Sequence, residues 1–168
     1  MTDLNEFRKQ KDDIFTHDGQ SPLTPEQKQA FKGLKYFPDN PELNLRVNVQ
    51  EFPDKEQIEM QTTTGDIQGY ERFGRFTFAV DGQPAELTIY RSDSGWFLPF
   101  VDSLAGKETY PAGRYLEPVE LEDGDFLVDF NLAYNPYCAY NDFWSCPLTP
   151  FENRLKVPIR AGEKLYQP

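Results

Sequence analysis

The chain has 168 residues and a formal net charge of −11, with a sequence pI near 4.5. This length fits one domain with a buried core, for which 14 Phe, 9 Tyr and 2 Trp supply bulky side chains. The acidic balance argues against nucleic-acid binding and against adsorption to an anionic membrane. The charged first residues form no signal peptide and no segment is apolar enough to span a membrane, so we expect a cytoplasmic protein.

The first forty residues are expected to be helical. Asp3 can cap a first helix, whose apolar side chains fall near one face and which ends at Asp18 and Gly19. The segment TPEQ, from Thr24 to Gln27, has the form of a capping box with proline at the first helical position. We expect this second helix to continue to about Tyr36.

From Leu43 onward the apolar residues alternate with polar ones, which is typical of antiparallel strands with one buried face. Asp81 and Gly82 form a favoured hairpin turn, in a loop that Gln83 and Pro84 are expected to lengthen. The predicted strands lie within 43–50, 57–62, 76–80, 87–90, 96–101, 115–119, 126–130 and 155–159. The pattern predicts a mainly β (α+β) fold, an antiparallel β-barrel or sandwich of about eight strands with two N-terminal helices. We expect a single domain over 1–168, with a helical segment at 1–40 and a β core at 41–168.

Several common motifs for phosphate, dinucleotide and zinc binding and for catalysis are incomplete or absent in the sequence. Gly106 and Lys107 lack the rest of a phosphate-binding loop, and no glycine pattern for a dinucleotide occurs. The only histidine is His17, so a histidine-dependent catalytic site has no candidate base in the β core. One histidine and two cysteines are too few for a structural zinc site. The sequence therefore predicts no metal site and no cofactor.

Residues 133–151 form a long aromatic loop with almost no charge. Three prolines after Tyr134 prevent a regular helix, and the many rings argue against disorder. We expect an ordered, largely buried loop, because connections of this length are usually functional when they are ordered. The loop either closes one end of the β core or forms the wall of a binding site.

The polar residues around this loop are the candidates for ligand binding. Arginine offers a planar fork for a carboxylate or phosphate, and neighbouring amides or carboxylates can orient it. The candidate ligand-binding residues are Arg114, Asn135, Glu152, Asn153 and Arg154. The alternative is that these charges form internal ion pairs, Arg114 with Glu152 or Asp102 with Arg154.

The two cysteines, Cys138 and Cys146, both lie in the aromatic loop. They can be a disulfide, a buried pair of inert thiols, or a reactive thiolate beside an arginine. For catalysis, Cys138 is the candidate nucleophile or redox thiol, and Asp102 or Glu152 is the candidate acid or base. Whether the protein is an enzyme stays open.

Five segments of the sequence resemble the bacterial and archaeal domain of unknown function 1684. They read SPLTPEQKQAFKGLKYFP, TTTGD, FVDSLAGKETYPAGRYL, DFNLAYNPYCAY and CPLTPFENRLKVPIRAGEK, and together they extend over nearly the whole chain. The resemblance implies a mostly β protein without an assigned activity, and it brings no catalytic residue with it.

Three hypotheses about function follow from these residues. The first is a domain that binds a small polar or anionic ligand under the aromatic loop. The second is a protein-interaction or structural module whose partner is unknown. The third is an enzyme that uses Cys138 or a carboxylate in the same pocket.

Overall fold

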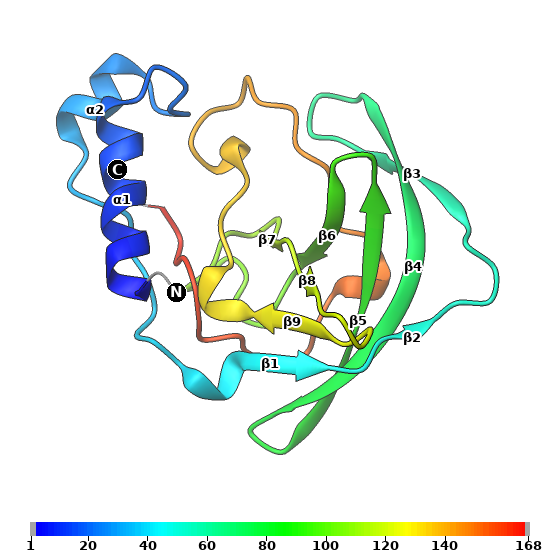
Figure 1. Cartoon of the computed structure of the whole chain (residues 1–168). Helices are drawn as coiled ribbons and strands as arrows, with labels where there is room; N and C mark the ends of the chain where they lie inside the picture. The colour runs from blue at the N-terminus through cyan, green and yellow to red at the C-terminus, as the bar shows by residue number, and fades with distance from the viewer. Residues whose placement is uncertain (1–2, 167–168) are drawn as a thin grey trace.

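The structure of the protein is a computed structural model, in which residues 3–166 are described (Figure 1). Two α-helices come first, α1 (Leu4–His17) and α2 (Pro25–Ala30). The strands are β1 (Asn44–Val47), β2 (Gln50–Glu51), β3 (Gln57–Gln61), β4 (Ile67–Val80), β5 (Gln83–Ser92), β6 (Gly95–Phe100), β7 (Arg114–Leu116), β8 (Val119–Glu120) and β9 (Phe126–Asp129). Short 3-10 helices occupy Pro41–Leu43, Phe130–Leu132, Tyr137–Ala139 and Phe151–Asn153.

The strands form two antiparallel sheets. One has three strands in the order β1-β9-β8, and the other has six, in the order β2-β4-β5-β6-β7 with β3 also paired to β4. Apolar side chains from both sheets share one core, as where the Phe126 ring of β9 lies 4.9 Å from the Trp96 ring of β6. This arrangement confirms the predicted mainly β fold with two N-terminal helices. Among residues 3–166 the sheets do not close into a barrel.

The β4–β5 hairpin is tighter than predicted. Asp81 and Gly82 have φ values of 51° and 80°, the conformation of a two-residue turn. Val80 pairs with Gln83 and Ala79 with Pro84, so both residues expected in the loop belong to β5. Proline is tolerated there because it lies near the start of the strand.

The predicted strand at 155–159 is wrong. This segment forms no ladder, although Arg154 makes a single parallel bridge to Val101. The alternation of Leu155, Val157 and Ile159 still places apolar side chains against the core, and Val157 and Ile159 are buried. Period-two burial alone therefore does not establish strand pairing.

The helical prediction is partly confirmed. The capping box is present, with Thr24 Oγ1 accepting from the Gln27 N–H at 3.1 Å and Gln27 Oε1 accepting from the Thr24 N–H at 2.9 Å. However, α2 ends at Ala30 and not near Tyr36. Within residues 3–166, neither α-helix is long and apolar enough to cross a membrane.

Candidate functional site

Arg114 is buried and holds the C-terminal segment in place. It donates to the carbonyl oxygens of Ile159 at 2.8 Å, Glu163 at 3.1 Å and Ala161. Its Nη2 also lies 3.6 Å from Asp102 Oδ2. Burial lowers the pKa of Arg114 to about 10, against the opposing effect of the Asp102 carboxylate. The ion pair expected between Arg114 and Glu152 is therefore wrong, because Arg114 pairs with Asp102.

Asp102, the buried partner of Arg114, also accepts two hydrogen bonds. Its Oδ1 accepts from Thr109 Oγ1 at 2.7 Å and its Oδ2 from the Ile159 N–H at 2.8 Å. The residue is only 4% exposed. The predicted pair between Asp102 and Arg154 is thus wrong as well, and Arg154 is exposed at the surface.

Asn153 ends the 3-10 helix Phe151–Asn153, and its side-chain amide bonds to two strands of the six-stranded sheet. Extending the register that pairs Tyr90 with Phe97 would place Thr88 opposite Pro99. Proline has no N–H, so it cannot donate a ladder hydrogen bond. The Asn153 amide takes this position: Nδ2 donates to the carbonyls of Thr88 and Pro99, both at 2.8 Å, and Oδ1 accepts from the Thr88 N–H at 2.9 Å.

Glu152 and Asn135 also have partners within the fold. Glu152 accepts from Arg72, with Nη2 to Oε1 at 2.7 Å, and from the Tyr90 hydroxyl. The Asn135 N–H donates to Glu163 Oε1 at 3.0 Å. Arg114 and Asn135 thus share Glu163 as a partner, whereas Glu152 and Asn153 bond to other residues, and the role of all these residues in ligand binding stays a prediction.

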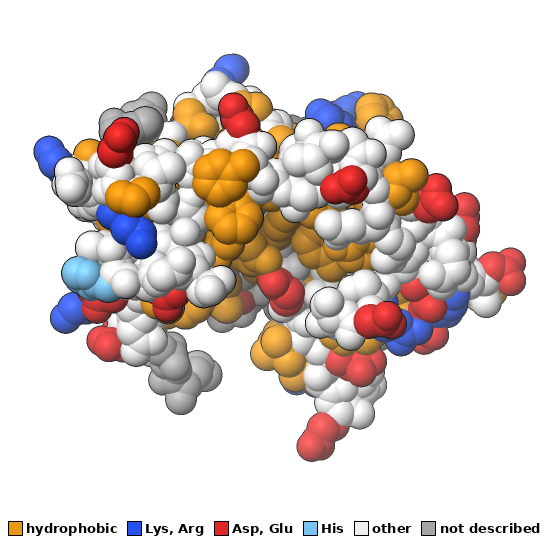
Figure 2. Space-filling model, turned by 90° about the horizontal axis from the view of Figure 1, so that it is seen from above, with side chains coloured by type: hydrophobic (Ala, Val, Ile, Leu, Met, Phe, Trp, Pro, Cys, Tyr) orange, Lys and Arg blue, Asp and Glu red, His pale blue; other side chains and the backbone are white. Residues whose placement is uncertain are grey.

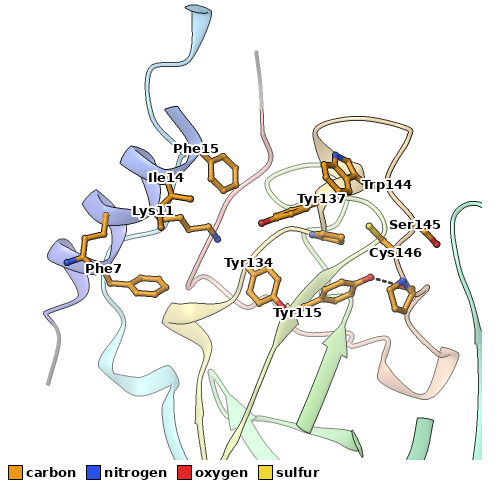
Figure 3. Close-up of a pocket in the computed structure, with 13 residues that line it drawn as sticks. Phe7, Lys11, Ile14, Phe15, Tyr115, Tyr134, Tyr137, Trp144, Ser145 and Cys146 are labelled. Atoms are coloured by element: carbon orange, nitrogen blue, oxygen red, sulfur yellow. Dashed lines mark hydrogen bonds between the residues drawn. The ribbon is translucent and has the colours of Figure 1, made fainter. Parts of the chain in front are cut away.

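A groove of about 590 Å³ lies between α1 and the aromatic loop (Figure 3). Six of its 13 lining residues are aromatic. The lining consists of Phe7, Gln10, Lys11, Ile14, Phe15, Tyr115, Tyr134, Pro136, Tyr137, Trp144, Ser145, Cys146 and Pro147. The space-filling view shows apolar side chains gathered in a hollow on this face (Figure 2). The sequence-based candidates do not line this groove.

The apolar face of α1 forms one wall of the groove. Phe15 is buried, but Phe7 is 37% exposed and Ile14 is 52% exposed. These side chains belong to the apolar face that the sequence predicted for the first helix. In the structure they point across the groove toward the aromatic loop (Figure 3).

The opposite wall presents aromatic rings whose hydroxyl groups are already engaged. The Tyr134 hydroxyl donates to Glu117 Oε1 at 2.6 Å, and the Tyr115 hydroxyl donates to the Pro147 carbonyl. Burial raises the pKa of both tyrosines well above the ordinary range, so both are neutral. The rings therefore offer apolar surface and no charge.

Lys11 extends from α1 and joins this helix to the rest of the protein at one side of the groove (Figure 3). Its ammonium group pairs with the buried Glu163 carboxylate, and it lies 5.1 Å from the centre of the Tyr134 ring. Glu163 Oε1 also accepts from the Tyr140 hydroxyl at 3.2 Å. Lys11 retains 20% side-chain exposure. It is therefore the positive charge that a molecule in the groove would meet.

The aromatic loop itself is ordered but less buried than predicted. Tyr140 is buried in a cluster with Phe15, whereas Phe143 is 66% exposed and Phe151 is 87% exposed. The loop is held along β3, where the Leu148 N–H donates to the Gln61 carbonyl at 2.8 Å. It does not fill the end of the β core with all its rings, and this leaves the groove.

These features define a two-sheet antiparallel β protein with a helix-flanked aromatic groove. The chain belongs to the protein family of unknown function DUF1684, whose family model matches residues 29–164. It is also similar to an uncharacterised protein of Haloarcula marismortui, whose structure was solved in solution by NMR. The two are 37% identical, with a TM-score of 0.71 over 96% of this chain and 91% of that one. A search of curated proteins finds no match.

Helix α1 precedes the part of the chain that the family model matches. The groove is therefore built from two parts, with Phe7, Lys11 and Ile14 outside the family match and the aromatic loop inside it.

Proposed function

We propose that this protein binds a small molecule whose apolar body lies in the groove between α1 and the aromatic loop. The observation that carries the proposal is the groove itself, about 590 Å³ with mostly aromatic walls. Small-molecule sites usually occupy roughly 300–1,000 Å³ and combine apolar walls with a few polar groups. Solvent-exposed Phe7 and Ile14 on α1 would be covered by such a ligand, and burying their surface would favour binding.

The polar groups at the groove favour a ligand with one anionic or hydrogen-bond-accepting end. Lys11 can attract a carboxylate or phosphate, and Gln10 and Ser145 can supply further hydrogen bonds. In this proposal Lys11, in place of Arg114 and Arg154, binds the anionic end of the ligand that was expected from the sequence. Glu163 limits the strength of that attraction, since it already pairs with Lys11.

A second apolar hollow of about 420 Å³ continues from the groove. It shares Phe7 and Tyr134 with the first and extends over Leu116, Val119 and Leu127. A ligand longer than a single ring system could extend past Phe7 into this space.

The test uses 1-anilinonaphthalene-8-sulfonate as a probe, because it combines aromatic rings with one anionic group. We expect saturable one-to-one fluorescence enhancement, and NMR shifts confined to α1 and residues 134–147. Phe7→Ser should weaken binding several-fold, because the ring lines both hollows. Phe151→Ser is the matched control, since it removes an even more exposed ring that does not line the groove. Equal effects of both variants, or shifts centred elsewhere, would overturn the proposal.

A further inference from the structure

The two cysteines of the aromatic loop are free thiols that contact each other. Cys138 is half-buried and Cys146 is buried. The Cys138 N–H donates to Cys146 Sγ at 3.3 Å, although the residues are eight positions apart in the chain. The two thiol groups are also hydrogen-bonded to each other, so their sulfur atoms already lie near one another, as closure of a disulfide requires.

The surroundings of Cys138 favour its thiolate. The hydrogen bond from the Cys146 thiol lowers the pKa of Cys138 to about 6, and a hydrogen bond from the Tyr110 hydroxyl at 3.6 Å acts in the same direction. Burial and the Asp142 carboxylate act in the opposite direction but are outweighed. The same bond between the thiols raises the pKa of Cys146, so Cys138 is the thiol of the pair that ionises first.

Exposure assigns different roles to the two thiols. Cys138 can be reached from solvent, whereas Cys146 is only 6% exposed and forms part of the groove wall. A thiolate that is accessible and has a second thiol in contact is the arrangement found in redox-sensitive cysteine pairs.

We propose that Cys138 and Cys146 are a redox site, in which Cys138 exchanges with a small-molecule disulfide and Cys146 then closes an intramolecular disulfide. This inference does not depend on ligand binding in the groove. In a reducing compartment such a bond would be transient, which suits sensing better than structural support.

The chemistry balances with oxidised glutathione as the oxidant. The Cys138 thiolate attacks one sulfur of that disulfide, forming a mixed disulfide and releasing one glutathione thiolate. Conversion of the Cys138 thiolate to the mixed disulfide removes the thiolate as acceptor of the hydrogen bond from Cys146, which is the main cause of the raised pKa of Cys146. Cys146 then gives its proton to solvent and attacks the Cys138 sulfur, releasing the second glutathione thiolate. The two protein thiols are oxidised and one glutathione disulfide is reduced.

The experiment incubates the native protein with oxidised glutathione, quenches with acid and measures intact mass. We expect the wild type to lose two hydrogen atoms without retaining glutathione. Cys146→Ser should stop at one bound glutathione, and Cys138→Ser should remain unmodified. A wild type that stays reduced until it is unfolded, or that accumulates the same mixed disulfide as Cys146→Ser, would overturn the proposal.

A second measurement tests whether the Tyr110 hydroxyl lowers the pKa of Cys138. Iodoacetamide should alkylate Cys138 with a half-maximal rate near pH 6, and Tyr110→Phe should move this midpoint to higher pH. Circular dichroism confirms that each variant is folded. A midpoint of the wild type near the ordinary thiol value of 9.0 would contradict the role assigned to Cys138.

Discussion

Replacing Asn153 by alanine should destabilise the protein strongly, although no ligand or catalytic group is involved. The Asn153 amide is fully buried and bridges β5 and β6 at the point where Pro99 cannot complete the ladder. Alanine would leave the Thr88 N–H and the carbonyls of Thr88 and Pro99 without this partner. These groups lie in the interior of the protein, where water cannot replace the amide without opening the sheet.

The expected loss in the free energy of unfolding follows from the number of buried backbone groups that lose their hydrogen-bond partner. Each buried polar group left without a partner costs about 1–3 kcal/mol, so three groups at the lower end give about 3 kcal/mol. For a chain of this size, 1 kcal/mol corresponds to roughly 2–4 °C in Tm, which predicts a decrease of about 6–12 °C. The neighbouring Arg154→Ala is the control, since its side chain is exposed and its loss should cost less than about 0.5 kcal/mol.

Urea unfolding followed by tryptophan fluorescence and circular dichroism measures this difference. A double-mutant cycle sharpens the test: Pro99→Ala restores an N–H that can donate directly to the Thr88 carbonyl. We therefore expect Pro99→Ala to be less harmful, or favourable, when Asn153 is already alanine. A loss below about 1 kcal/mol for Asn153→Ala, with additive effects in the cycle, would refute this account of the sheet.

Three further predictions concern charge and backbone conformation. Glu163→Gln should cost about 2 kcal/mol and accelerate amide exchange in α1 more than in β4 and β5, because Lys11 loses its buried ionic partner. Glu152→Gln should cost under about 1 kcal/mol at pH 7. Burial raises the pKa of Glu152, but hydrogen bonds led by that from Arg72 lower it overall, so this contribution is present above pH 4.5 and should fade in urea titrations at lower pH. Gly113→Ala should cost more than about 2 kcal/mol by the same assay, since φ is +99° and the added Cβ would overlap the Phe100 carbonyl, whereas Gly19→Ala, with no neighbour within 4 Å, should be close to neutral.

Local sequence signals predicted the fold class because they depend on local physics. The capping box at Thr24 and the turn at Asp81 and Gly82 are decided by a few neighbouring residues, and both are present, although the turn lacks the longer loop that was expected around it. The end of α2 depends instead on tertiary contacts. Phe31 and Leu34 pack on the Phe15 cluster from non-helical backbone, so helical spacing was a misleading guide after Ala30.

The site was harder to predict because residue type does not reveal whether a polar group already has a partner. Arg114 and Asn153 carry suitable groups for ligand binding, yet buried carbonyl oxygens occupy them. The sequence signal for the groove was of a different kind. It was the apolar face of α1, which is partly exposed in the structure. Phe7 and Ile14 were visible in the sequence as such a face, but only the structure shows that a cavity and not a core lies beneath them.

The two proposals meet at the aromatic loop, whose geometry depends on contacts with several distant segments. Lys11 and Glu163 fix one side of the groove, and Cys146 forms part of the opposite wall. A disulfide between Cys138 and Cys146 would replace a hydrogen bond by a covalent bond within that wall. Any change in groove affinity on oxidation must then disappear in Cys138→Ser, while probe binding to the reduced protein should persist. Failure of one proposal therefore leaves the other open to its own test.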